Sequence, residues 1–206
     1  RLPADIGRLT GLKELDLSRN PLTSLPESLS GLTALEWLDL SKTRLTDIPD
    51  VVGSLGALKE LVATTAGLHA LPDSLGRLEN LERLLVGYNA LTDLPESFEE
   101  LTRLRYLGLG NNALSKPPRV LAKLPALRAV SLFGNKDILD SVDEWVDAFE
   151  ACPALTTVFV GYGAAFTGSG FHAGGLKAAF EARGGTSDGP YTSLAGVRIV
   201  ATNAAG

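Results

Sequence analysis

The sequence predicts an α/β solenoid with a curved parallel β-sheet on its concave face and short helical or 3₁₀ turns on its convex face. Two periodic features support this fold class. A Leu-Pro or Ile-Pro pair returns every 23 residues, at Leu2-Pro3, Leu25-Pro26, Ile48-Pro49, Leu71-Pro72 and Leu94-Pro95, and Pro117-Pro118 continues the series. A leucine pattern recurs between these pairs, starting at Leu12, Leu35, Leu58, Leu81, Leu104 and Leu127. A fixed period of this length is typical of stacked units, because one unit cannot bury its apolar side alone.

A short strand is expected near the start of each leucine pattern. In the first unit, Leu15 and Leu17 are two residues apart and therefore point to the same side of a strand. Glu14, Asp16 and Ser18 then point to the opposite side. Strands of successive units should lie side by side in one parallel sheet whose polar side lines the concave face.

A tight turn should follow each strand, and an asparagine there can satisfy buried backbone groups because its amide carries both a donor and an acceptor. The predicted structural turn residues are Asn20, Asn89, Asn112 and Asn135. The second unit has Thr43 in this place, which can do part of this work, and the third has Ala66, which can do none. We therefore expect an irregular turn or an ordered water near Ala66.

Apolar residues spaced by three precede each strand, as in Ile6, Leu9 and Leu12. This spacing suits a helical or 3₁₀ turn that packs inward from the convex side. The same spacing returns in the units that contain Leu29, Leu75 and Phe98.

The regular units are expected over residues 1–135, and residues 136–206 should form irregular repeats and a modified C-terminal cap of the same domain. The next leucine pattern starts at Leu155, 28 residues after Leu127, and the extra length predicts a true helix. Ser141 would be its N-cap, with Glu144 completing a capping box. One face of this helix would carry the apolar residues Val142, Trp145, Val146 and Phe149.

The last forty residues predict less regular structure. A Gly/Ala/Ser-rich segment follows Gly163, and a short helix is expected over residues 176–182, ended by Gly184-Gly185. The pattern Leu194-x-x-Val197-x-Ile199 resembles one more degenerate repeat strand. We expect the cap to cover the open edge of the sheet.

The segments LPxxL, LxxLxxL and LxLxxN, in a 23-residue unit, resemble the leucine-rich-repeat family. The similarity is to intracellular members related to Ras suppressor and Scribble, to the plant intracellular Ras-group proteins and to similar bacterial proteins. It covers Arg1 to about Asn135. The resemblance implies the solenoid fold but no particular partner, because these families share a scaffold and differ in what they bind.

Composition narrows the class of partner. The 206 residues are 45% hydrophobic and 21% charged, which is ordinary for one folded domain. A net charge of −5 opposes nucleic-acid binding, and no apolar run approaches the ~18 residues of a membrane span. The single cysteine, Cys152, excludes an internal disulfide and predicts a reducing, cytoplasmic location. A protein or peptide partner is therefore expected, and self-association stays open.

Catalytic, metal and cofactor sites are not predicted. The acidic residues Asp143, Glu144, Asp147 and Glu150 lack the spacing of a calcium loop and indicate a solvated helix face. Residues 168–175 contain several glycines but no phosphate-binding fingerprint. The sequence therefore does not favour a small-molecule or nucleotide enzyme that uses this loop. His69 and His172 are about four repeats apart, too far to share a site. Cys152 is expected to act as a small apolar residue.

The concave face should carry any functional site. One column of outward residues alternates in charge over its first five members and predicts a salt-bridge ladder: Lys13, Glu36, Lys59, Glu82, Arg105 and Arg128. Other columns change from charged residues in the first units to apolar and aromatic residues and glycines later. Exposed aromatic side chains on a sheet usually mark an interaction surface.

We define the aromatic face as the predicted partner-binding set: Val62, Arg83, Leu85, Tyr88, Arg105, Tyr106, Phe133, Phe159 and Tyr162. Neighbouring glycines are expected to leave room for a partner to approach the backbone. The cap could instead cover Phe159 and Tyr162, and Trp37 is a separate candidate. The predicted function is non-catalytic recognition of a protein or peptide. The alternative is a targeting domain of a larger signalling enzyme or secreted effector, because no polar capping unit precedes Leu2.

Overall fold

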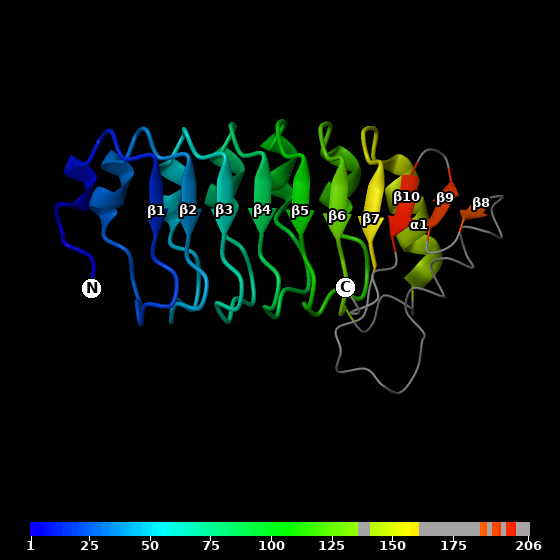
Figure 1. Cartoon of the computed structure of the whole chain (residues 1–206), viewed down its shortest axis with the longest axis horizontal. Helices are drawn as coiled ribbons and strands as arrows, with labels where there is room; N and C mark the ends of the chain where they lie inside the picture. Colours follow the sequence, from blue (N-terminus) through cyan, green and yellow to red (C-terminus); the bar gives the residue numbers. More distant parts are fainter. Residues whose placement is uncertain (136–140, 161–185, 189–190, 195–196, 201–206) are drawn as a thin grey trace.

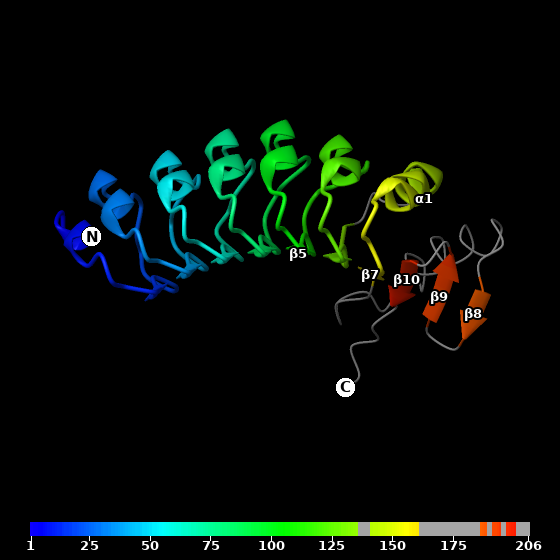
Figure 2. The same ribbon diagram turned by 90° about the horizontal axis from the view of Figure 1, so that it is seen from above.

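The computed structural model of the chain describes residues 1–135, 141–160, 186–188, 191–194 and 197–200. These residues form a shallow arc in which strands occupy the inner, concave side and helical turns the outer, convex side (Figures 1 and 2). The predicted α/β solenoid is therefore confirmed. The predicted helix at 176–182, the glycines at 168–175, His172 and Tyr162 lie outside the described residues.

The concave sheet begins with parallel strands that lie side by side in the order of the chain. They are β1 (Glu14–Asp16), β2 (Trp37–Asp39), β3 (Glu60–Val62), β4 (Arg83–Leu85), β5 (Tyr106–Gly108), β6 (Ala129–Ser131) and β7 (Thr157–Phe159). Their register follows the repeat, since Glu14 pairs with Trp37, Trp37 with Glu60 and Glu60 with Arg83. Equivalent residues of successive units therefore form columns across the sheet.

The convex turns are 3₁₀ helices, one of the two forms that the three-residue spacing predicted. They are η1 (Ile6–Arg8), η2 (Glu27–Gly31), η3 (Asp50–Ser54), η4 (Asp73–Arg77), η5 (Glu96–Glu100) and η6 (Arg119–Lys123). A proline precedes each helix from η2 onward, and its fixed φ suits an extended residue at a helix entrance. The Pro72 carbonyl, for example, accepts a hydrogen bond from Leu75 N–H at 3.2 Å. This local role explains the 23-residue return of proline.

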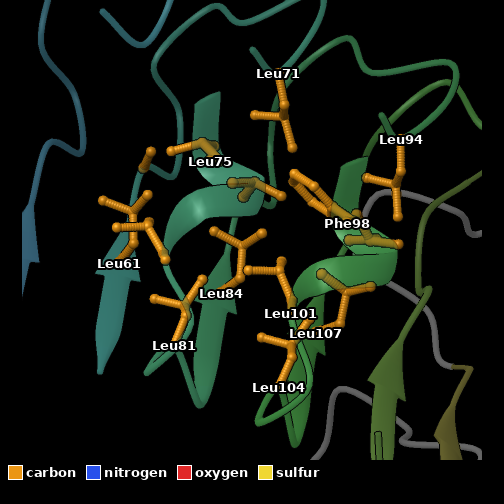
Figure 3. Packing of buried hydrophobic residues seen from close by; sticks show 14 of the residues in the cluster. Leu61, Leu71, Leu75, Leu81, Leu84, Leu94, Phe98, Leu101, Leu104 and Leu107 are labelled. Carbon is orange, nitrogen blue, oxygen red and sulfur yellow. The ribbon is translucent and has the colours of Figure 1, made fainter. Parts of the chain in front are cut away.

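The core lies between the strands and the 3₁₀ helices. Leu61, Leu84 and Leu107 point inward from three neighbouring strands and are fully buried. They pack against residues from the convex side, among which Leu75 and Phe98 are also fully buried (Figure 3). Each unit therefore buries its leucines against those of its neighbours, as stacked repeats require.

A left-handed residue follows each of the first five strands, and the sequence analysis did not foresee this feature. Arg19, Lys42, Thr65, Tyr88 and Asn111 have φ between +53° and +58°. Such values are uncommon outside glycine and unfavourable for a β-branched threonine. The conformation is held by the stack, because each of these N–H groups donates to a carbonyl of the next unit, as Tyr88 does to Gly110 at 2.8 Å.

Helix α1 (Val142–Ala151) backs β7 in place of a 3₁₀ helix, and Trp145, Val146 and Phe149 on its inner face are fully buried. The predicted capping box is wrong. Ser141 occupies the N-cap, but its hydroxyl donates to the Ser115 carbonyl of the preceding unit instead of capping the helix. The carboxylate of Glu144 lies 3.6 Å from the Lys116 ammonium. Both side chains therefore join α1 to the previous repeat.

The C-terminal strands correct a second prediction. Strand β10 (Val197–Val200) extends the parallel sheet beside β7, but Ile199 pairs with Val158, a register shifted by two residues from the predicted repeat. Leu194 belongs to β9 (Tyr191–Leu194), which is antiparallel to β10 and to β8 (Thr186–Asp188). This segment covers the β7 edge with the parallel strand β10, and β9 and β8 then continue the sheet in antiparallel fashion instead of forming another repeat unit. Alternating apolar residues predicted the strand, but a period of two cannot fix its register.

Candidate functional site

The concave side chains are set by the alternation of each strand. In β4, Leu84 is fully buried in the core, whereas Arg83 is exposed and Leu85 half-buried on the concave side. The same alternation places Val62 and Tyr106 half-buried on neighbouring rows. Strand alternation therefore brings the members of the aromatic face that lie in strands onto one surface.

The acidic residues of the first rows are engaged by the protein itself. Asp16 Oδ1 accepts a hydrogen bond from Ser18 N–H at 2.8 Å, and Asp39 Oδ1 accepts one from Ser41 N–H at 2.7 Å. The hydrogen bonds from Ser18 lower the pKa of Asp16 below its usual value. These carboxylates stabilise the turn after the strand, a role that Leu85 cannot fill at the equivalent position in β4.

The charge ladder forms in two parts. Glu36 lies 3.2 Å from the Lys13 ammonium and 2.7 Å from that of Lys59, and Glu82 lies 3.2 Å from Arg105. Hydrogen bonds from Lys59 and Lys13 lower the pKa of Glu36. Among the ion pairs of the described residues, none joins Lys59 to Glu82. The break coincides with the row where the surface changes from charged to apolar.

Arg83 links the charged rows to the aromatic ones. Its Nε lies 3.1 Å from a carboxylate oxygen of Glu60, and its guanidinium carbon lies 4.8 Å from the centre of the Tyr106 ring. The second contact is a cation–π interaction. Tyr106 is half-buried on the concave side, with Arg83 against its ring.

The aromatic pair of Tyr88 and Phe133 spans three units. The two ring centres are 6.1 Å apart with an interplanar angle of 65°, which is an edge-to-face contact. Tyr88 still exposes 57% of its surface, although its left-handed backbone is fixed by the stack. It is therefore a large, exposed side chain on a fixed backbone, with the Phe133 ring against it.

The prediction that glycines leave room for a partner is wrong for the middle rows. Gly87, Gly108 and Gly110 are all buried. A Cβ added to Gly110 would meet the Phe133 ring at 2.4 Å, so this ring occupies the space left by the absent side chain. Gly110 therefore serves the protein's own aromatic packing, because it lets Phe133 cross unit five to reach Tyr88. Sequence reasoning missed this because the columns alone do not show that a ring can lean across an intervening row.

The remaining candidates are Phe159, Trp37 and Arg105. Phe159 is half-buried at the end of β7, where it pairs with Val200 of β10. Trp37 is half-buried on β2. Arg105 is exposed beside Tyr106. The structure thus places Val62, Leu85, Tyr106 and Phe159 on the sheet, with Tyr88 and Phe133 at the turns that follow the strands.

The asparagines hold the turns that carry this surface. Asn112 Nδ2 donates to the carbonyls of Val86 and Leu109 at 3.0 Å, and its Oδ1 accepts from Leu91 N–H at 3.0 Å. Asn89 and Asn135 make equivalent bonds, while Asn20 donates only within its own unit. Each inner asparagine therefore joins two units.

The turn at Ala66 departs from the other units, as expected. Gly67 adds a second left-handed residue with φ +73°. The Ala66 N–H donates to Asn89 Oδ1 at 3.0 Å, and Asn89 Nδ2 donates to the Ala63 carbonyl at 2.9 Å. The next unit therefore supplies hydrogen bonds that Ala66 cannot. Thr43 fills its part by donating to the Leu40 carbonyl at 2.8 Å.

Reactive and metal-binding groups are scarce in the described part of the chain. Cys152 is buried, its thiol lies 3.2 Å from the Leu121 carbonyl, and burial raises its pKa to about 11. The thiol is therefore protonated at neutral pH and unsuited to nucleophilic attack. Within the described ranges, no cluster of histidine, cysteine or acidic residues could hold a metal ion, and no helix is long and apolar enough to cross a membrane.

Comparison with known proteins agrees with this architecture. A family model described as leucine rich repeat matches residues 4–45, 57–114 and 79–136, which together make up more than half of the chain. The chain is therefore a repeat protein of the solenoid class, and it belongs to the leucine-rich-repeat family. No curated protein sequence matches it significantly.

Solved structures give further matches. A leucine-rich-repeat protein of Leptospira interrogans is 30% identical, with a TM-score of 0.67 over 74% of this chain and 39% of that one. The leucine-rich repeat domain of the type III effector XopL is 28% identical, with a TM-score of 0.61 over 66% and 49%. The ectodomain of the Arabidopsis thaliana receptor kinase GASSHO1/SCHENGEN3, in complex with Casparian strip integrity factor 2, is 28% identical, with a TM-score of 0.60 over 79% and 20%. The chain thus spans less than half of each of these three.

Proposed function

We propose that this chain is a non-catalytic recognition module that binds a protein or peptide on the aromatic face. The observation that carries the proposal is Tyr88, which is 57% exposed yet held by a left-handed backbone and by the Phe133 ring. Such a side chain can be buried by a partner with a reduced loss of conformational entropy, because its backbone is already ordered and its ring already contacts Phe133. Tyr106, held by Arg83, offers a second ring on the same side.

The repeat scaffold supports this function in physical terms. Backbone hydrogen bonds run between every pair of neighbouring units, so the surface is ordered before any partner arrives. Exposed tyrosines are among the residues that contribute most to protein interfaces. The receptor kinase ectodomain, which shares the fold, was solved in complex with a partner, and this likeness favours a recognition role here.

The test is affinity capture with the wild-type chain and a Tyr88→Ala/Tyr106→Ala double variant, followed by binding measurements with the purified captured protein. We expect the double variant to bind at least about tenfold more weakly, because two interface tyrosines can each contribute more than ~1 kcal/mol. Leu9→Ala is the matched control, since Leu9 is 52% exposed but lies beside η1, away from the aromatic face. Equal binding by wild type and the double variant would exclude this surface.

A second candidate function is recognition within a larger signalling enzyme or secreted effector. It is favoured by the likeness to the repeat domain of a type III effector, of which this chain spans 49%. The test is the size of the native protein in the source cells, measured by immunoblotting with an antibody against this chain. A band near 21.7 kDa in cells and medium would contradict this candidate.

We also propose that the protein is cytoplasmic and that it binds neither nucleic acid nor membranes. With a net charge of −5, the chain should bind neither duplex DNA nor anionic vesicles. Cell fractionation and sedimentation with each probe at physiological salt test this point. Analytical ultracentrifugation of the purified chain tests self-association.

A further inference from the structure

The charge of the concave face changes sign along the arc. In the rows of β1 to β3, acidic and basic side chains alternate, and Asp16 and Asp39 are held in turn hydrogen bonds. In the rows of β4 to β6, whose concave residues are all described, the charged groups are three arginines and one glutamate: Arg83, Arg105, Arg128 and Glu82. The aromatic half of the face therefore carries local positive charge in a protein that is acidic as a whole.

The partners of these arginines differ. Arg83 Nε lies 3.1 Å from Glu60, whereas Arg105 contacts Glu82 at 3.2 Å through one guanidinium nitrogen and keeps 57% of its side chain exposed. Arg128 is exposed and makes no ion pair with any residue that the structure describes. The next residue of its column is Thr156, which cannot supply a charge.

Arg105 and Arg128 occupy neighbouring rungs. The N–H of Arg128 donates to the Arg105 carbonyl at 2.9 Å, which fixes their backbones at the usual strand spacing of about 4.8 Å. Like charges on neighbouring strands repel one another. An anionic group placed between the two guanidinium groups would remove this repulsion, and guanidinium groups bind carboxylates with well-defined geometry.

An apolar surface adjoins the arginine pair. Tyr106 follows Arg105 directly, and Tyr88 and Phe133 lie at the other end of the strands. Extended chain rises about 3.3 Å per residue, so these two regions are separated by roughly three to five residues of an extended peptide. One short segment can therefore contact both.

We infer that the partner segment is an acidic peptide, with a carboxylate side chain against Arg105 and Arg128 and an apolar side chain against Tyr88 and Phe133. This inference rests on the proposed function and adds the chemistry of its ligand. The net charge of −5 does not prevent an acidic peptide from binding here. Exposed charges are screened beyond a Debye length of about 8 Å at physiological salt, so the charges near the two arginines decide the interaction.

The test is selection of random peptides about twelve residues long, displayed on phage, against the immobilised full chain. Selected peptides should be enriched in Asp or Glu placed about three to five residues from an aromatic or aliphatic residue. A synthetic copy of a selected peptide is then titrated against the wild type, Arg128→Gln and Arg128→Glu. We expect affinity to fall about threefold for Arg128→Gln and at least about tenfold for Arg128→Glu, with steeper salt dependence for the wild type.

Arg119→Gln is the matched control, because Arg119 is also exposed but begins η6 on the convex side. It should leave the affinity unchanged. Selected peptides that lack acidic residues but lose binding with Tyr88→Ala/Tyr106→Ala would overturn the acidic chemistry and leave the proposed function intact. Selection of no peptide would overturn an acidic peptide ligand, and peptides insensitive to every concave variant would contradict both proposals.

Discussion

The first three rows of the concave face and the next three share one scaffold and differ in almost everything that faces solvent. Leu38 and Leu61 on the early rows are as fully buried as Leu84 and Leu107 on the later ones. On the outer side, Asp39 gives way to Gly108 at the equivalent position. The fold therefore depends on the inward columns, which repeat, and a site can evolve in the outward columns, which do not.

The two regions also use their outward residues differently. In the early rows Asp16 and Asp39 cap turns, and Glu36 is held between two lysines, so the polar groups satisfy one another. In the later rows Phe133 packs edge-to-face against Tyr88 and leaves it largely exposed. Polar groups that already bond to one another form few new bonds with a partner. An exposed ring, in contrast, can bury apolar area against a partner.

The largest effect is expected for inward positions, in either region. Leu84→Ala removes a fully buried side chain and should lower the free energy of unfolding by about 2–5 kcal/mol. Leu85→Ala, one residue further along the same strand, removes a half-buried concave side chain and should cost less than about 1 kcal/mol. Urea unfolding monitored by circular dichroism measures both. Similar losses would show that the strand alternation does not separate core from surface.

The next largest effect distinguishes the inner asparagines from the outer one. Asn112→Ala leaves the Leu91 N–H and the Val86 and Leu109 carbonyls without their side-chain partner, which should cost about 1–3 kcal/mol. Asn20→Ala should cost less, because Asn20 is exposed and bonds only within its own unit. The same unfolding experiment applies, with Asn20→Ala as the control. A larger loss for Asn20 would contradict the inter-unit role of this amide.

The inward half of the molecule was predictable from sequence because stacking imposes a strict period on it. The 23-residue interval predicted the strands, helical or 3₁₀ turns on the convex side, and the asparagine positions. The capping box at Ser141 was wrong because a local sequence motif cannot show that the Ser115 carbonyl lies within reach of the hydroxyl. The predicted register of β10 was wrong because the sequence did not show that this strand also pairs antiparallel with β9.

For the outward side chains, the sequence predicted only which residues share a column across the sheet. The columns placed Tyr106, Leu85 and Val62 on one face, and the structure agrees. They did not show that Phe133 covers Gly110 to reach Tyr88, because this contact joins rows two units apart. Left-handed residues were also missed, since Tyr88 has no intrinsic preference for that conformation, although Asn111 does.

Gly110 and Gly108 in the later rows differ in the space around them. Gly110→Ala should displace the Phe133 ring, because the added Cβ would lie 2.4 Å from it, and should cost about 1 kcal/mol through loss of the edge-to-face contact with Tyr88. Gly108→Ala should be nearly neutral, because its nearest neighbours lie at 3.5 Å, an ordinary contact distance. Near-ultraviolet circular dichroism and thermal unfolding measure the two effects. An unchanged aromatic signal in Gly110→Ala would mean that the ring does not occupy this space.

The smallest effect tests whether the early rows are satisfied internally. Lys59 and Lys13 hydrogen-bond to Glu36 and lower its pKa, so they favour its charged form in the folded state. A carboxyl group with a folded pKa below its unfolded pKa contributes stability above the unfolded value, and this contribution is lost as pH falls through the folded value. Lys59→Gln, which removes the closer lysine, should therefore raise the pKa of Glu36 and flatten the acid side of the stability profile near that range. Carbon-13 NMR titration of the Glu36 carboxyl measures the shift, with Lys42→Gln as the control on the same face. Because the pair is exposed, the change should shrink in 1 M salt, and a shift that persisted there would require a cause other than these two lysines.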